Sequence, residues 1–237
     1  MAALVATGDG VSIAAIPVIA SEATLLSRGV VFCPCFPTPA SDGSATNLLP
    51  SLNLTDLTEV SMMDLAQEDS TYAFYKNIRE DNLDDEGNVR STAAFPVQAL
   101  VDAITPSLLK HFVDTIDEVY IDDLFVVHYN TGQFDSRCAK HQDPSDVTVN
   151  VCLESSADLV GSQILFYDRK GLKGGKGEKG EEGEIFRVDC RLGECTLHWG
   201  AHPHETTPLE KGRRTNVVMT MAYKDKLKSG ANRSCCA

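Results

Sequence analysis

The sequence predicts an α+β protein in which a jelly-roll barrel follows supporting N-terminal helices. Apolar residues recur at helical spacing in 95–104 and 106–119, which is typical of helices that pack one face against a core. Many short strands behind a helical front half favour a jelly roll with attached helices. Six segments have strand-like composition, at 124–130, 147–153, 163–167, 184–189, 195–199 and 216–223.

The 237 residues suffice for one folded unit of this kind rather than several domains. We expect an acidic, partly loop-rich extension over 1–90, the barrel over 91–225 and a basic tail over 226–237. Within the extension, composition favours a short helix at 21–26, a first strand at 30–33, and loops at 37–51 and 78–91.

A glycine-rich insert at 171–185 interrupts the barrel segment. Glycine occurs at every third position from Gly171 to Gly183, which gives five collagen-like triplets. A collagen triple helix requires much longer runs, usually with proline, so we favour a charged hairpin tip. The alternative is a lid that closes over a binding site.

Charge is distributed unevenly along the chain. Residues 1–120 hold 17 acidic and 5 basic side chains (−12), whereas residues 121–237 hold 17 and 16 (−1), which together give −13. Nucleic-acid binding through phosphate neutralisation requires clustered Lys and Arg, so no nucleic-acid partner is expected. The acidic front half favours a solvated surface, with docking of a basic protein as the alternative.

The sequence also predicts a soluble intracellular protein located in the cytoplasm. No segment approaches the roughly 20 apolar residues of a membrane span, and the amino terminus lacks the pattern of a secretory signal. Eight cysteines do not make a disulfide framework in a chain of this length, so reduced thiols are expected. The alternative is a zinc site of Cys33, Cys35, Cys235 and Cys236, although both pairs are spaced more tightly than usual zinc ligands.

One group of residues has the pattern of a metal site. His141 and Asp143 are two positions apart, and His204 follows 61 residues later (204 − 143 = 61). Side chains two apart in a strand project from the same face, so one short strand would supply both His141 and Asp143. Two imidazoles and one carboxylate leave three coordination positions open, which suits ferrous iron that binds a co-substrate and O2 together. The pattern therefore predicts an oxygen-activating enzyme.

Polar residues further along indicate how a co-substrate would be held. A guanidinium grips a carboxylate through two donors, so Arg214 is suited to the far carboxylate of a keto acid. Strand alternation should turn one of Arg213 and Arg214 inward and the other outward. The polar face of 147–153 includes Asn150, and Asn216 should face inward as well. Asn150 and Asn216 are therefore candidate contacts of the co-substrate or substrate.

The chain resembles the iron- and 2-oxoglutarate-dependent dioxygenases, in the branch related to the prolyl and lysyl hydroxylases and to the 2-oxoglutarate and iron-dependent oxygenase domain proteins. The resemblance covers about residues 120–223, roughly half the chain. One departure is Gly161-Ser162, where relatives usually carry two glycines, and it concerns a close backbone approach rather than the metal pattern. The matching segments are Tyr129 in Phe125-Val-Val-His-Tyr-Asn, His141-Gln-Asp143, 146–153, 161–166, 193–200, and the run from His204 to Asn216.

The resemblance implies roles for individual residues. The ten-residue step from His204 to Arg214 (214 − 204 = 10) matches the family register, so His204 is expected as the third ligand in preference to His198 or His202. Arg214 is then the inward arginine. His198 is expected to be a core histidine with satisfied hydrogen bonds. Tyr129 falls where a phenol hydrogen-bonds the co-substrate carboxylate, with a plain core aromatic as the alternative.

The resemblance further implies a double-stranded β-helix, cupin-like barrel that binds Fe(II), with 2-oxoglutarate as co-substrate and ascorbate as reductant. Such enzymes use O2 to convert 2-oxoglutarate to succinate and CO2 while they hydroxylate an unactivated C–H bond. Family halogenases lack the carboxylate ligand, so the presence of Asp143 favours hydroxylation. The expected substrate is a prolyl or lysyl side chain of a protein or peptide.

Two alternatives to this function stay open. The same chemistry could act on a small molecule, which a deep closed pocket would favour over an open groove. A metal-binding jelly roll used only for interaction would bind iron yet release no succinate. Sequence alone does not choose among the three.

Overall fold

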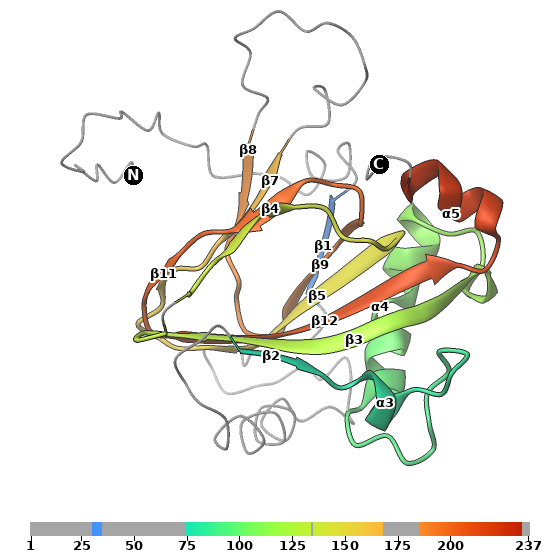
Figure 1. Ribbon diagram of the computed structural model, residues 1–237, viewed down its shortest axis with the longest axis horizontal. Helices are drawn as coiled ribbons and strands as arrows, with labels where there is room; N and C mark the ends of the chain where they lie inside the picture. The colour runs from blue at the N-terminus through green and yellow to red at the C-terminus, as the bar shows by residue number, and fades with distance from the viewer. Residues whose placement is uncertain (1–29, 35–73, 134, 168–184, 234–237) are drawn as a thin grey trace, which may run out of the picture.

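The computed structural model describes residues 30–34, 74–133, 135–167 and 185–233 (Figure 1). Within these residues the chain forms three antiparallel sheets, of six, four and two strands. The six-stranded sheet has the order β1-β9-β5-β12-β3-β2. Its strands are β1 (Val30–Pro34), β2 (Phe74–Asn77), β3 (Val119–Asn130), β5 (Val147–Ser155), β9 (Glu194–Trp199) and β12 (Arg213–Tyr223).

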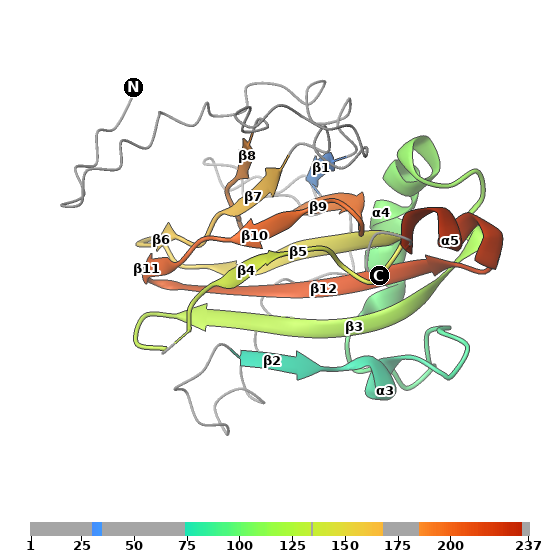
Figure 2. The same ribbon diagram turned by 45° about the horizontal axis from the view of Figure 1, so that its top comes forward.

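The four-stranded sheet lies over β5 and β12 of the large sheet in both views (Figures 1 and 2). It has the order β4-β10-β7-β8, and the two-stranded sheet pairs β11 with β6 beside it. The antiparallel sheets with few helices agree with the expected α+β class. These strands are β4 (Cys138–His141), β10 (His204–Thr206), β7 (Ile164–Tyr167), β8 (Ile185–Val188), β6 (Val160–Gly161) and β11 (Leu209–Lys211).

The main core lies between helix α4 (Val97–His111) and the face of the large sheet that points away from the small sheet. The helix buries residues at spacings of three and four, as an amphipathic helix does. From β5, the alternate residues Val147, Val149 and Val151 enter this core. The intervening residues of β5 consequently face the small sheet, where the polar face of 147–153 was expected.

Two helices were expected on either side of Pro106, and this prediction was wrong. Helix α4 continues through Pro106, and only the one-turn η1 (Ile116–Glu118) precedes β3. Proline cannot donate to the carbonyl four residues earlier, here Asp102. Both residues are exposed, so water can hydrate that carbonyl and the helix is not forced to end.

The large sheet includes strands from both sides of residue 90. The strand predicted at 30–33 is confirmed as β1, which pairs with β9, while β2 pairs with β3. The segment 78–91, expected as a loop, contains the short helix α3 (Arg79–Asn82). The expected helix at 21–26, the loop at 37–51, most of the insert at 171–185 and three of the four cysteines of the zinc alternative lie outside the described residues.

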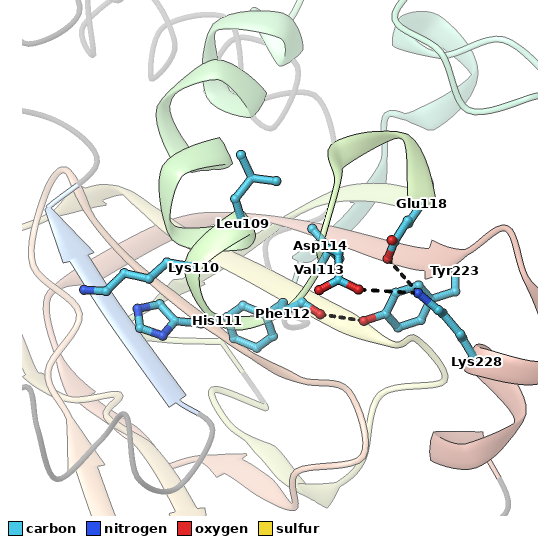
Figure 3. A pocket seen from close by; sticks show the side chains of 9 residues that line it. All are labelled: Leu109, Lys110, His111, Phe112, Val113, Asp114, Glu118, Tyr223 and Lys228. Atoms are coloured by element: carbon cyan, nitrogen blue, oxygen red, sulfur yellow. Dashed lines mark hydrogen bonds and ion pairs between the residues drawn. The ribbon is translucent and has the colours of Figure 1, made fainter.

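Helix α5 (Lys226–Arg233) closes the described chain and is anchored at an open cleft beside the end of α4 (Figure 3). The Tyr223 hydroxyl donates to the Phe112 carbonyl at 2.6 Å, and Lys228 pairs with Glu118 at 3.1 Å and with Asp114 at 3.9 Å. Tyr223, Lys228, Glu118 and Asp114 in this cleft therefore pair with one another or with the backbone. Among the described residues, no helix is both long and apolar enough to cross a membrane.

Candidate metal centre

Three side chains from distant parts of the chain converge between the two larger sheets. The ligand atoms of His141, Asp143 and His204 all lie within 4.8 Å of one another. Asp143 Oδ1 is 3.3 Å from His141 Nε2 and 3.8 Å from His204 Nε2. Neighbouring ligand atoms around an octahedral ion with bonds of roughly 2.1 Å are about 3 Å apart. The Asp143 oxygen is thus already close to this spacing from both nitrogens, and the group would contract further to hold one ion.

Strand pairing brings the two histidines together. His204 opens β10 and His141 ends β4, and the antiparallel register of these strands places the two residues directly opposite each other. Their rings are 4.3 Å apart between centroids. A single cross-strand pair thus brings together two ligands that are 63 positions apart in the sequence (204 − 141 = 63).

Asp143 is not on the same strand as His141, which corrects the expected arrangement. Strand β4 ends at His141, and Asp143 lies two residues beyond it in the loop that leads to β5. Its backbone N–H donates to the Gly200 carbonyl at 2.8 Å. This hydrogen bond to the residue after β9, rather than strand pairing, holds the backbone of Asp143 in place.

Backbone carbonyls fix the orientation of both histidine rings. His141 Nδ1 is 2.8 Å from the Ala139 carbonyl, and His204 Nδ1 is 3.0 Å from the His202 carbonyl. A carbonyl only accepts, so each Nδ1 carries a proton, and Nε2 of each ring is the nitrogen that points toward Asp143 and is left to bind a metal. This is the tautomer that a metal-binding histidine requires, with the partner that commonly orients it.

The carboxylate of Asp143 stays charged although its side chain is mostly buried. Burial alone would raise its pKa, but the hydrogen bond with His141, the charges of His198 and His204 and the Thr148 hydroxyl together lower the pKa below its ordinary value. Thr148 Oγ1 donates to Asp143 Oδ2 at 2.6 Å. The negative charge that a divalent cation needs is therefore present.

The two histidines differ in their affinity for protons. The hydrogen bond with Asp143 raises the pKa of His141 to about 10, with a contribution from Cys138, whose Sγ is 3.6 Å from the ring. Burial lowers the pKa of His204. The metal-free site consequently holds a proton on His141, and a cation must displace it.

His198 is confirmed as a buried histidine beside the site. Its Nδ1 contacts the Trp199 carbonyl at 3.0 Å, its Nε2 is 3.8 Å from Asp143 Oδ2, and burial lowers its pKa to about 3. It does not belong to the group whose ligand atoms lie mutually within 4.8 Å. His202 packs its ring against Phe166 at 5.4 Å between centroids.

A buried guanidinium lies on strand β12 of the large sheet. Arg214 is 2% exposed, whereas Arg213 is exposed and pairs with Glu154 on the outer side, so the expected alternation is confirmed. Nη1 of Arg214 donates to the Ser162 carbonyl at 2.6 Å and contacts Cys190 Sγ at 2.8 Å. Its Nε is buried and has no hydrogen-bond partner. A carboxylate placed there would satisfy that donor.

Tyr129 lies beside this guanidinium. The two residues are cross-strand partners in β3 and β12, and the Arg214 guanidinium carbon is 5.0 Å from the centre of the Tyr129 ring. Burial raises the pKa of Tyr129 to about 12, against a smaller lowering by Arg214. The phenol therefore remains a neutral donor at physiological pH.

Asn150 and Asn216 also face the space between the sheets, as expected. Asn216 Nδ2 donates to Asn150 Oδ1, while Asn216 Oδ1 is buried without a hydrogen-bond partner. Both residues line a small cavity together with Thr196 and Cys152. The unused acceptor leaves Asn216 able to contact a water or a ligand donor.

The antiparallel sheets and the two-histidine, one-carboxylate group define a class: the chain has the fold of the 2-oxoglutarate- and Fe(II)-dependent oxygenases. No protein-family profile and no curated relative matches the sequence. The likeness is to solved structures. An oxidoreductase of the 2OG-Fe(II) oxygenase family from Burkholderia pseudomallei aligns over 90% of this chain and 94% of its own, with a TM-score of 0.51 and 16% identity.

Two further structures show the range of proteins with this fold. A prolyl hydroxylase from Trichoplax adhaerens, in complex with a peptide of hypoxia inducible factor, aligns over 91% of this chain and 90% of its own at a TM-score of 0.51 and 16% identity. The alpha-ketoglutarate-dependent epimerase SnoN from nogalamycin biosynthesis aligns over 85% and 82% at a TM-score of 0.54 and 15% identity. The fold is thus shared by proteins that handle peptides and small molecules.

Sequence reasoning placed all seven of its candidate residues in this region but missed three contacts. Thr148 holds Asp143, Ser162 holds Arg214 through its carbonyl, and Cys190 contacts Arg214 as well. Thr148 is two positions before Asn150 and so belongs to the polar face predicted for 147–153, which made its inward direction available from strand alternation. Contacts of the other two depend on turns whose geometry has no simple sequence pattern.

Proposed function

We propose that this chain is an Fe(II)- and 2-oxoglutarate-dependent oxygenase that hydroxylates an unactivated C–H bond. Two features between the larger sheets carry the proposal: a convergent His141, Asp143 and His204 group, and a buried Arg214 with an unpartnered Nε. The first suits a divalent metal and the second suits an acid. A keto diacid bound between them would use both.

The three convergent side chains would hold the iron on one face. Their chemistry fits the metal because two neutral Nε2 lone pairs and one ionised carboxylate form a hard and borderline donor set. Iron with this ligand set supplies oxidative decarboxylation of 2-oxoglutarate to succinate and CO2, coupled to hydroxylation. Thr148 and the Gly200 carbonyl keep Asp143 in place for this role.

Arg214 would orient the co-substrate. Its buried guanidinium would grip the distal carboxylate through Nε, and the Tyr129 phenol beside it would donate to the same group. Asn150 and Asn216 would contact the remainder of the co-substrate or the substrate. Burial of Arg214 excludes water, which strengthens the ion pair with the incoming acid.

For the substrate we propose a prolyl or lysyl side chain of a protein or peptide. Support comes from the structural likeness to a prolyl hydroxylase bound to a peptide, together with a His141 side chain that is 38% exposed, so that solvent reaches this ligand. The likeness to the epimerase SnoN supports a small-molecule substrate as the second candidate. Ascorbate as reductant and a cytoplasmic location complete the proposal.

Succinate release tests the function. The full-length protein would be incubated with Fe(II), 2-oxoglutarate, ascorbate and O2, alongside His141→Ala and Arg214→Ala, with His111→Ala in the remote cleft as the matched control. We expect release by the parent and by His111→Ala, and loss in the other two. Equal background release from all four proteins would rule out the proposed enzyme activity. The alternative of a metal-binding module used only for interaction would then be favoured.

Substrate class is tested in the same assay. Peptides that contain proline or lysine are compared with matched peptides that lack them, and products are examined by mass spectrometry. Stimulated succinate release with the gain of one oxygen atom on the predicted residue supports a protein hydroxylase. If the protein turns over 2-oxoglutarate but no peptide stimulates succinate release, the small-molecule alternative is favoured.

A further inference from the structure

Ser162 has an unusual backbone conformation next to the Arg214 guanidinium. Its φ is 56°, and it is the one non-glycine residue with positive φ in the described part of the chain. Side chains with a Cβ are disfavoured there, and such residues cluster at functional sites. The preceding Gly161 has φ 79° as well, so two successive left-handed residues precede β7.

The turn is fixed by its neighbours rather than by the serine. The Ser162 N–H donates to the Pro208 carbonyl at 3.0 Å, and a Cβ on Gly161 would lie 2.2 Å from that same oxygen. A glycine at position 162 would adopt this backbone at lower cost. The serine side chain is therefore not explained by the turn.

The Ser162 hydroxyl makes no hydrogen bond in the ligand-free protein. The residue is 1% exposed, and its Oγ is buried without a hydrogen-bond partner. Buried hydroxyls in folded proteins are nearly always paired, so an unpaired one calls for a missing partner. Its own carbonyl, however, accepts from Arg214 Nη1 at 2.6 Å, which places the residue against the guanidinium.

Two buried donors on residues that are hydrogen-bonded to each other thus lack an acceptor: Arg214 Nε and Ser162 Oγ. A carboxylate offers two oxygens and about four lone-pair sites, so a single acid can accept from both. The Tyr129 ring also lies against the guanidinium, whose carbon is 5.0 Å from the ring centre. The missing acceptor has the chemistry of the distal carboxylate already assigned to Arg214.

We propose that Ser162 is a third donor to the distal carboxylate of the keto diacid, so that its hydroxyl helps select a diacid over a keto acid without the second carboxylate. This inference rests on the proposed function. Ser162 contributes twice: its carbonyl orients Arg214 and its hydroxyl binds the ligand. Only the second contribution depends on the side chain, so a substitution separates the two.

The test measures binding without turnover. Full-length protein loaded with Mn(II) is titrated calorimetrically with 2-oxoglutarate and with 2-oxobutyrate, which has the keto acid but no distal carboxylate. Ser162→Ala keeps the Cβ and loses the hydroxyl. Ser156→Ala is the matched control, because the Ser156 hydroxyl already accepts from the Arg213 N–H at 3.0 Å on the outer side.

We expect Ser162→Ala to weaken 2-oxoglutarate binding by roughly ten-fold or more, the usual effect of losing a hydrogen bond to a charged group. Binding of 2-oxobutyrate and the behaviour of Ser156→Ala should be unchanged. Since the lost hydroxyl is unpaired without ligand, the thermal midpoint of the ligand-free variant should not fall. Ser162→Gly should have a midpoint at least as high as that of Ser162→Ala, with the same weakened binding.

Several results would overturn the inference. Unchanged 2-oxoglutarate affinity in Ser162→Ala would show that the hydroxyl does not reach the acid. Equal weakening for both keto acids, or a lowered midpoint without ligand, would assign it a structural role. If the parent itself bound no 2-oxoglutarate, the proposed function would fall first, and the inference with it.

Discussion

Thr148 and Asp143 are joined by a hydrogen bond of 2.6 Å in which the threonine hydroxyl donates to Oδ2, leaving Oδ1 toward the two histidines. The donor lies on β5 and the acceptor in the loop before it. A buried threonine thereby decides which carboxylate oxygen faces the proposed metal. Residues that orient a ligand in this way influence affinity although they do not touch the ion.

Thr148→Val should weaken metal binding by about 10- to 100-fold, because valine keeps the shape and removes the donor. Thr148→Ser, which keeps a hydroxyl, should bind almost as the parent does. Titration of the metal-free proteins with Co(II), followed by visible absorption, measures both. Parent-like affinity in Thr148→Val would show that Asp143 is held by its backbone alone.

The contrast between two adjacent arginines gives a second prediction. Arg214→Lys replaces a planar fork by a point charge at a buried position and should weaken 2-oxoglutarate binding at least ten-fold. Arg213→Lys, at the exposed neighbour paired with Glu154, should leave the affinity unchanged. Calorimetry on the Mn(II)-loaded proteins measures the difference. If Arg213→Lys weakened binding as much, the inward assignment of Arg214 would be wrong.

Gly200 offers a prediction about the loop that carries Asp143. A Cβ on Gly200 would lie 2.1 Å from the Ser145 carbonyl, and the Gly200 carbonyl accepts the Asp143 N–H. Gly200→Ala should therefore displace the loop and abolish tight Co(II) binding. In Gly132→Ala the new Cβ meets nothing within 4 Å, but the φ of 104° is unfavourable for alanine. That variant should therefore lose stability without losing Co(II) binding. Retained Co(II) binding in Gly200→Ala would show that the loop adapts.

Acid should destabilise the metal-free protein partly through His198. Burial lowers its pKa from 6.5 to about 3 in the folded protein. At pH values between these two pKa values the unfolded chain therefore binds more protons than the folded protein does. The free energy of unfolding must then fall as the pH decreases through that window. His198→Asn removes the titrating group. Between pH 7 and pH 5 the parent should lose about 2 kcal/mol more than the variant.

Urea unfolding in the presence of a chelator, at both pH values, measures that difference. Both proteins share every other titrating group, so their common acid sensitivity cancels. Losses that are equal in parent and variant would show that His198 is already protonated in the fold, or that its burial is relieved by water.

Strand β5 of the large sheet was predictable because its residues alternate, whereas β2 of the same sheet was not predicted. In β5, Val147, Val149 and Val151 face α4, while Thr148 and Asn150 face the site. This two-residue alternation of apolar and polar residues is visible in the sequence. The strands that form the site were harder. Strands β4 and β10 have four and three residues, too few for a periodic pattern, yet their pairing brings His141 opposite His204.

The candidate ligands were predictable from residue type and spacing, whereas the reason for their alignment was not. Asp143 was expected on a strand and is instead held by Thr148 and Gly200 in a loop. Likewise, the single helix through Pro106 depends on solvent around Asp102, a tertiary property. Sequence pattern identifies groups with suitable chemistry, and packing determines how each is oriented.

Anaerobic absorption spectroscopy addresses the central assignment most directly. The metal-free protein is mixed with ferrous salt, and 2-oxoglutarate is added without O2. A keto acid that chelates iron at His141, Asp143 and His204 should produce a weak visible charge-transfer band, and succinate, which lacks the keto group, should not. A protein that binds the iron and shows the same featureless spectrum with either acid would contradict the assignment.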